Sequence, residues 1–393
     1  MDRQMRTLFN GGFSQEHHQR LLDEIQDQSG VKVPFRIAET PVFMESVLMQ
    51  KILEASRDIF SVILKEPYLS KSKLAVPSNC FVPGSEKRPT MLALDFAITT
   101  DNHGEWKPQL IELQGFPSLF YYQLLLGNAF KSAYPVTSQW KHLFHDEQDW
   151  LEQMHHLILN GHSVDEVILL ELDPKNQNTY IDFAETSRHL GIDVVCLSEL
   201  FVDDGYVYRR KGGQKMKVKR IYNRVIFDEL HQRPELIGGF DMLTSVNVEW
   251  VCHPNWYFRI SKYALPYLPL SCVPHTVFGD DSLVHDLDLS QYVLKPLFSF
   301  SGQGVVLDVN ADILSQIKHR SDYILQKKID YAPCIETPDG FAKTEIRVMF
   351  VWTGQHDTPV PMITLARLSK GAMVGVKYNK DKTWVGSSIA FWR

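Results

Sequence analysis

The stretch that decides the fold is residues 91–114, MLALDFAITTDNHGEWKPQLIELQ. Two strand-like runs, 91–98 and 109–114, flank the polar loop 99–104, and this arrangement predicts a β-hairpin. The even-numbered residues from 92 to 98 are apolar and share one face, which leaves Asp95 on the other. If the hairpin is centred on His103 and Gly104, Asp95 falls opposite Glu112.

The two facing carboxylates suggest a cation site. Ile111 and Leu113 are expected on one face of the second strand, and Glu112 and Gln114 on the other. Carboxylates directly across a strand pair repel each other unless a cation lies between them. Magnesium prefers such oxygen ligands, completed by water and substrate phosphates. The alternative is a solvated hairpin face on which both acids are simply exposed.

A second candidate site lies in residues 292–306, YVLKPLFSFSGQGVV. Lys295 stands inside an apolar strand, where its charge is costly unless an anion meets it. A loop of small residues with two glycines follows, and backbone amides of such a loop can close over phosphate oxygens. The alternative is a lysine that extends to water beside an ordinary hairpin turn. GxxxxGK[ST], GxGxxG, HExxH and GxSxG are all missing, so a bound nucleotide needs another geometry.

Two arginines near the end of the chain could recognise a carboxylate or a phosphate. Glu345 and Arg347 share the polar face of a predicted strand, and Arg367 interrupts the apolar run 363–366. The planar guanidinium suits both kinds of anion. For this pair of strands, an internal salt bridge between Glu345 and one of the arginines is the favoured interpretation.

The rest of the pattern is mixed α and β. Helices are expected over 14–29 and 42–64, and the order strand, helix, strand over 167–197 predicts a βαβ unit with parallel strands. A second hairpin is expected over 206–226, and mostly strands follow residue 292. The loop at 172–178, which connects the first strand to the helix of this unit, lacks the glycines of a dinucleotide-binding site. Dinucleotide binding is therefore the least favoured function. Domain boundaries are expected near residues 160 and 260, which divides the chain into the regions 1–160, 161–260 and 261–393.

Composition narrows the class of protein. The 393 residues are 44% hydrophobic and 22% charged, and the formal net charge of −6 with scattered basic residues argues against a dedicated nucleic-acid surface. Five widely spaced cysteines form no CxxC or Cys/His pattern. No run approaches the roughly 20 apolar residues of a membrane span, and residues 1–12 lack a secretory pattern. We therefore expect a cytoplasmic protein with neither nucleic-acid nor membrane partners.

The order of these segments resembles that of the circularly permuted ATP-grasp proteins, which include the synthetase half of glutathionylspermidine synthetase and related bacterial proteins. In these proteins the acidic strands come early, and the lysine strand with its glycine loop comes late. The matching segments follow in that order: Asp95 with Glu112–Gln114, 219–224, 254–262, Lys295–Pro296 with 302–304, 323–326 and 366–385.

The resemblance implies an α/β (α+β) fold, an ATP-grasp module in permuted order preceded by a βαβ subdomain at 161–260. It implies Mg²⁺ and ATP as cofactors, and a carboxylate that attacks the γ-phosphate to give an acyl phosphate, which an amine captures. The implied magnesium ligands are Asp95, Glu112 and Gln114, and the implied catalytic residues are Arg224 and Arg367. The implied ATP contacts are Lys262, Lys295, Ser301, Gly302, Gln303, Gly304, Gln326, Lys327 and Ile329.

Three positions depart from the family pattern. Gln114 stands where asparagine is usual, Ala93 where arginine is usual, and Asn223 replaces the first arginine of a pair. These changes leave two alternatives to a ligase acting on small-molecule carboxylates and amines. One is a kinase that uses the same site, and the other is a protein that binds nucleotide without turning it over.

Overall fold

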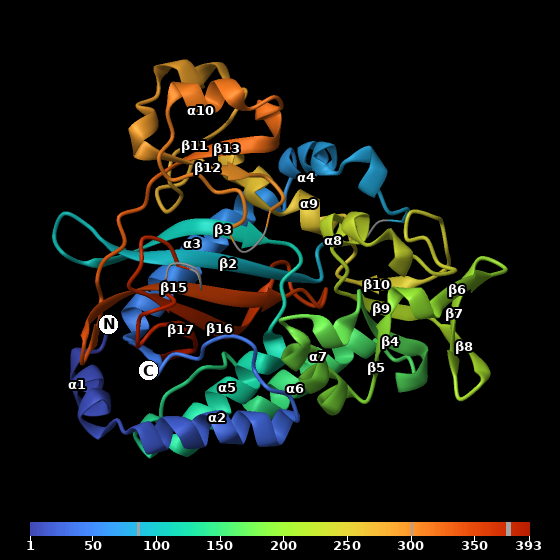
Figure 1. The fold of residues 1–393 in the computed structure, drawn as a ribbon, viewed down its shortest axis with the longest axis horizontal. Helices are drawn as coiled ribbons and strands as arrows, with labels where there is room; N and C mark the ends of the chain where they lie inside the picture. The colour runs from blue at the N-terminus through green and yellow to red at the C-terminus, as the bar shows by residue number, and fades with distance from the viewer. Residues whose placement is uncertain (85–86, 300–301, 375–378) are drawn as a thin grey trace.

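A computed structural model describes residues 1–84, 87–299, 302–374 and 379–393 (Figure 1). The largest sheet of the described residues is antiparallel, with strand order β17-β16-β15-β2-β3 and β14 paired to β15. Its strands are β2 (Met91–Thr100), β3 (Trp106–Gln114), β14 (Ile335–Thr337), β15 (Gly340–Val351), β16 (Val360–Ser369) and β17 (Gly386–Ser388). The predicted regions 1–160 and 261–393 are therefore joined in one sheet.

In the β2–β3 hairpin Asp95 pairs with Glu112, as predicted, but a bulge and not the position of the turn brings them together. Near the turn, Thr100 pairs with Trp106, so the hairpin is centred on His103 and would place Asp95 opposite residue 111. A register shift beside Asp95 inserts Ile111 as an extra residue and restores the predicted pair. The prediction that Ile111 and Leu113 share one face of the strand is wrong because of this bulge. Ile111 lines a cavity, whereas Leu113 packs in the core.

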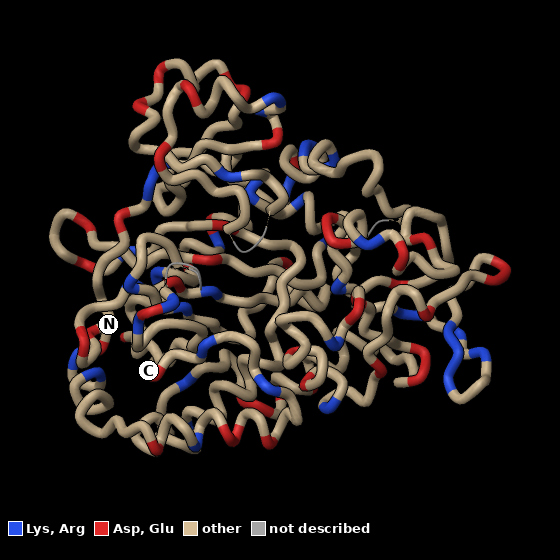
Figure 2. Tube along the Cα trace, in the orientation of Figure 1, with Lys and Arg blue, Asp and Glu red and all other residues tan. Residues whose placement is uncertain are grey.

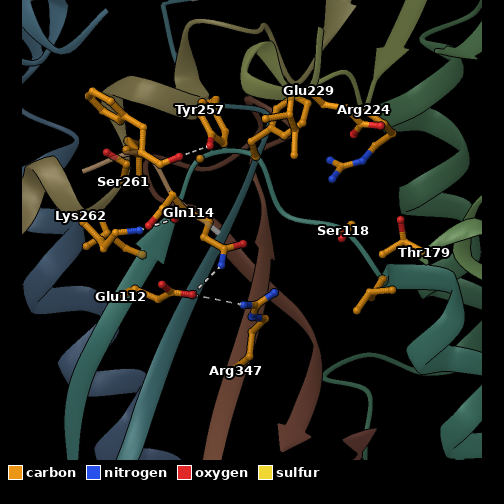
Figure 3. Close-up of a pocket in the computed structure, with 18 of the residues that line it drawn as sticks. Glu112, Gln114, Ser118, Thr179, Arg224, Glu229, Tyr257, Ser261, Lys262 and Arg347 are labelled. Carbon is orange, nitrogen blue, oxygen red and sulfur yellow. Dashed lines mark hydrogen bonds and ion pairs between the residues drawn. The ribbon is translucent and has the colours of Figure 1, made fainter. Parts of the chain in front are cut away.

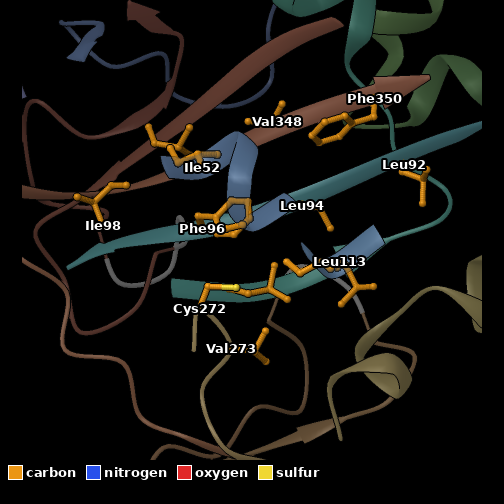
Figure 4. Close-up of a cluster of buried hydrophobic side chains, with 14 of the residues drawn as sticks. Ile52, Leu92, Leu94, Phe96, Ile98, Leu113, Cys272, Val273, Val348 and Phe350 are labelled. Atoms are coloured by element: carbon orange, nitrogen blue, oxygen red, sulfur yellow. The ribbon is translucent and has the colours of Figure 1, made fainter. Parts of the chain in front are cut away.

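The two faces of this sheet are covered differently. Helix α3 (Ser46–Ile63) packs on the face formed by the even-numbered residues 92–98, and Figure 4 shows part of this core. Phe60 of α3 meets Phe350 of β15 edge to face at 4.9 Å between ring centroids. The opposite face packs on α5 (Phe120–Ala133) and α6 (Glu147–Leu159). Residues 42–44, predicted as helix, instead form β1 (Val42–Met44), which pairs with β18 (Ala390–Trp392).

A second sheet confirms the predicted βαβ unit. Its order is β10-β9-β4-β5, all parallel, and its elements are β4 (Val167–Glu171), α7 (Tyr180–Leu190), β5 (Asp193–Cys196), β9 (Arg220–Asn223) and β10 (Glu249–Val251). The hairpin predicted over 206–226 ends before residue 220, because residues 220–223 belong to this sheet.

A small antiparallel sheet projects from this unit. It consists of β6 (Leu200–Asp203), β7 (Tyr206–Lys211) and β8 (Gln214–Val218). Figure 2 shows lysines and arginines gathered on the β7–β8 hairpin, which corrects the expectation of scattered basic residues. Acidic side chains neutralise part of this cluster: Lys211 lies 3.0 Å from Asp165 and 2.8 Å from Asp193, and Lys215 pairs with Asp203.

The lysine strand lies in another three-stranded sheet, with order β11-β13-β12. Its strands are β11 (Thr276–Phe278), β12 (Tyr292–Pro296) and β13 (Tyr323–Lys327), and α10 (Ala311–Gln316) packs beside them at the top of Figure 1. The remaining helices are α1 (Arg3–Gly12), α2 (Gln15–Ser29), α4 (Tyr68–Lys71), α8 (Phe227–Gln232) and α9 (Trp256–Arg259). None of the helices among the described residues combines the length and apolar character needed to cross a membrane.

Candidate functional site

A cavity of about 330 Å³ opens where β3 ends, between the largest sheet and the parallel sheet (Figure 3). Five residues implied by the resemblance line it: Glu112, Gln114, Arg224, Lys262 and Arg367. Figure 3 shows Lys262, Glu112 and Arg347 toward one end and Arg224 and Glu229 toward the other. We call these the cation end and the far end.

A second cavity of about 360 Å³ lies between the β11-β13-β12 sheet and β15. Four more of the implied residues line it: Lys295, Gln326, Lys327 and Ile329. The Lys295 ammonium donates a 2.5 Å hydrogen bond to Oε1 of Gln326. Ile111 of β3 and Glu345 of β15 complete the wall toward the first cavity, so β3 and β15 contribute to both cavities.

An ion cluster separates the two cavities. Arg347 donates from Nε and from a terminal nitrogen to the two oxygens of Asp95, at 2.5 and 2.6 Å, and Arg367 donates to Asp95 at 2.7 Å. Arg367 also lies 3.2 Å from Glu345, which accepts a 2.7 Å hydrogen bond from Tyr331. The expected salt bridge to Glu345 is present, and Asp95, 1% exposed, has both oxygens engaged by guanidinium groups.

Glu112 is the carboxylate that faces the cation end. Burial alone would raise the pKa of Glu112, but the charges of Lys262, Arg367 and Arg347 lower it to about 2. Burial lowers the pKa of Lys262, and it lowers the pKa of Lys295 to about 8, while Glu112 opposes both shifts. Glu112 therefore stays ionised beside the buried Lys262 and the partly buried Lys295.

The oxygen donors on the wall of the first cavity are too few to hold Mg²⁺ alone, and they fit this ion only if a bound phosphate supplies further ligands. No group of three His, Cys, Asp or Glu side chains among the described residues is arranged to hold a metal ion. Glu112 and the amide of Gln114 remain as donors on the cavity wall, and the Gln114 amide donates a 3.0 Å hydrogen bond to Glu112. Magnesium commonly uses one or two carboxylates together with substrate phosphates and water, which this pair can supply.

Residues 302–304 of the glycine loop form a turn after β12. Gly302 and Gly304 have φ angles of +71° and +72°, which favour glycine, and Leu294 and Val306 exchange two backbone hydrogen bonds of 3.0 and 2.9 Å. Within the described part of the chain, residues 302–304 line neither cavity, whereas Val305 lines the second. Ser301 lies outside the described residues. Lys262 donates to the backbone carbonyl of Ser299, just before this loop.

Arg224 follows β9 and lines the far end of the first cavity. Its guanidinium lies 4.4 Å from the centre of the Phe116 ring and donates a 2.8 Å hydrogen bond to the Pro117 carbonyl. Glu229, in α8, lies at the same end in Figure 3. Glu171, at the end of β4, also lines the cavity, and its carboxyl group interacts electrostatically with both Arg224 and Glu229. Neither acid was predicted from the sequence, and the only available signal was the position of Glu171 at the carboxyl end of a parallel strand.

Comparison with known proteins gives distant relatives. No family model matches. The chain is 30% identical over 155 residues to "Putative glutamate–cysteine ligase 2-3" of Frankia alni, covering 34% of this chain and 18% of the relative. It is 28% identical over 169 residues to "Putative glutamate–cysteine ligase 2-2" of Frankia casuarinae, covering 37% and 20%. The matched segment thus spans about a fifth of each curated relative's length.

Nearly the whole chain is matched by a solved structure. It is similar to a glutathione synthetase-like effector from Globodera pallida, with a TM-score of 0.60, 12% identity and 96% of both chains covered. Because the identity is so low, this similarity concerns the fold alone. The chain has the mixed α/β fold of that glutathione synthetase-like protein.

Proposed function

We propose that this protein is an ATP-dependent carboxylate–amine ligase with an ATP-grasp fold in circularly permuted order. One observation carries the proposal. Between the two cavities, four cations (Lys262, Lys295, Arg347, Arg367) are gathered around three carboxylates (Asp95, Glu112, Glu345). A polyphosphate would supply the missing negative charge.

The second cavity is the proposed nucleotide site. Its wall includes Gln326 and Lys327 at the end of β13 and residues 328–329 after it, and this segment would lie along the adenine. The N–H groups of Lys327 and Lys328 are already donated to the carbonyls of His275 and Gln291, which leaves the adenine edge to the other polar groups of the segment. Lys295 is in this wall and Lys262 lies beside Glu112 in the first cavity, so the two ammonium groups would hold the phosphates at the boundary. Glu112 and Gln114 would hold Mg²⁺, which supplies charge neutralisation on the phosphates when bound.

The first cavity is the proposed acceptor site. Its cation end would orient a substrate carboxylate through Arg367 and Arg347, whose positions are fixed by Asp95. Fixed guanidinium groups stabilise the charge that develops during phosphoryl transfer without reorganising. The amine would then attack the acyl phosphate in this cavity. The aromatic rings of Tyr257 and Phe298 lie in its wall and would keep water from part of it.

The comparisons support the class of reaction. The two curated relatives are named as ligases that join glutamate to cysteine, and the solved structure is named as glutathione synthetase-like. Because the matched segment is a fifth of each relative, the substrates of this chain are not taken from those names.

Hydroxylamine trapping tests the proposal. The protein is incubated with Mg-ATP, hydroxylamine and a panel of small carboxylic acids, and hydroxamate and ADP are measured together. We expect one or more acids to give hydroxamate and ADP in equal amounts, because hydroxylamine captures an acyl phosphate. Glu112→Gln and Arg367→Gln should reduce both products at least tenfold. In parallel reactions with small alcohols in place of the acids and hydroxylamine, ADP release with a stable phosphate ester would identify a kinase instead. Tight ATP binding with no product from any acid would refute the ligase.

A further inference from the structure

We propose that the far end of the first cavity binds the ammonium and carboxylate of an α-amino acid, through Glu171 and Arg224 respectively. The inference rests on the proposed function, because it assigns the substrate class to the same cavity. The subsite binds the amino acid whose carboxylate is activated. The amine that becomes acylated belongs to a second substrate molecule.

Arg224 has hydrogen-bonding capacity to spare. It is 6% exposed, its guanidinium donates to the Pro117 carbonyl at 2.8 Å, and its buried Nε has no partner among the described residues. Phe116 supports one face of the guanidinium at 4.4 Å. That Nε is closed off from the cavity, so a ligand carboxylate would pair with the part of the guanidinium that lines the cavity wall.

Glu171 supplies a carboxyl group that can take the opposite charge when an ammonium binds beside it. It is 5% exposed, and one of its oxygens accepts a 2.7 Å hydrogen bond from the backbone N–H of Leu172. Glu229, from α8, lines the same end and accepts a 2.6 Å hydrogen bond from Gln177. The far end thus combines one guanidinium with two carboxyl groups.

This mixture of charges selects among substrate classes. A purely cationic amine would meet Arg224 without compensation, and a purely anionic acid would meet the Glu229 carboxylate and gain nothing from Glu171. A zwitterion satisfies both signs. The cation end, with Lys262 and Arg367, can take a second carboxylate, so the pattern of the whole cavity fits an acidic amino acid.

Binding an ammonium here should release a proton. Burial raises the pKa of Glu171 to about 8, with Arg224 opposing the shift and Glu229 adding to it. At pH 7 the free protein therefore holds Glu171 mostly protonated. A ligand ammonium favours the carboxylate form, so the proton leaves as the ligand binds.

Calorimetry without nucleotide tests the subsite, using L-glutamate, glutarate and 4-aminobutyrate at pH 7. Glutarate lacks the ammonium and 4-aminobutyrate lacks the α-carboxylate, so each removes one charge. We expect L-glutamate to bind at least tenfold more tightly than either, with proton release detected by repeating the titration in buffers of different ionisation enthalpy.

Three variants complete the test. Glu171→Gln, which preserves shape, should weaken L-glutamate binding at least tenfold, abolish proton release and leave glutarate binding unchanged. Arg224→Gln should weaken L-glutamate but spare 4-aminobutyrate, and circular dichroism checks its fold. Glu235→Gln, an exposed acid near α8, is the control and should change nothing.

Equal affinity for glutarate and L-glutamate, absence of L-glutamate binding, or unaltered binding by Glu171→Gln would overturn the inference. Failure of the ligase proposal is distinguishable. Selective L-glutamate binding without any ATP-dependent hydroxamate would refute only the ligase, whereas hydroxamate formed equally well from glutarate and L-glutamate would refute only the amino-acid subsite.

Discussion

Replacing Asp95 with asparagine is expected to destabilise the protein by about 3 kcal/mol, because it leaves buried guanidinium charge uncompensated. Asp95 is 1% exposed and accepts three charge-assisted hydrogen bonds, two from Arg347 and one from Arg367, at 2.5 to 2.7 Å. Removing one partner of a buried ion pair costs about 3–5 kcal/mol. We expect the lower end, because Glu345 remains 3.2 Å from Arg367 and Glu112 remains 3.8 Å from Arg347.

Urea unfolding followed by tryptophan fluorescence measures this effect. Asp58→Asn, on the exposed side of α3, is the matched control and should leave the midpoint unchanged. Adding Arg347→Met to Asp95→Asn should recover part of the lost stability, since one uncompensated charge is then removed. A loss below about 1 kcal/mol for Asp95→Asn, together with abolished Mg-ATP binding, would refute the positioning role and favour direct metal ligation.

Three further outcomes are expected. Because the pKa of Lys295 is lowered to about 8, Mg-ATP affinity should be full below pH 8 and fall above it as the ammonium loses its proton; titrations from pH 6.5 to 9.5 should show this fall, and Lys295→Arg should remove it. Gly304→Ala should destabilise the protein more than Gly302→Ala in urea, because both positions have positive φ but a Cβ at Gly304 lies 2.8 Å from Pro296 Cγ; equal losses would contradict this. Asp182→Asn should cost about 1–3 kcal/mol in the same assay, because Asp182 accepts three backbone N–H groups at the start of α5; an unchanged midpoint would show that the cap is dispensable.

Local patterns in the sequence predicted the pieces of the site. The alternation around Asp95 and Glu112 identified the hairpin and its facing acids, and Lys295 in an apolar strand was recognisable because a buried lysine needs an anion. The parallel strands of 167–197 followed from their apolar runs and short joints.

The remainder depends on contacts between distant parts of the chain. Arg347 meets Asp95 across 252 residues, and no local pattern specifies that the pair would engage both carboxylate oxygens. The bulge at Ile111 changes which side chains face the cavity. The strict alternation of side chains along a strand, on which the sequence prediction relied, does not anticipate such an extra residue. The far end joins Glu171, Arg224 and Glu229 from three elements, so its charge pattern appears only once the parallel sheet and α8 are assembled.

Calorimetric titration with Mg-ATP tests the nucleotide assignment most directly, comparing the unaltered protein with Lys295→Ala, Glu112→Ala and the control Lys211→Ala in the β7–β8 hairpin. We predict micromolar binding that Lys295→Ala and Glu112→Ala each weaken at least tenfold and that Lys211→Ala leaves unchanged. Absence of binding to the folded, magnesium-supplied protein, or equal binding by all four proteins, would contradict an ATP site between Lys295 and Glu112.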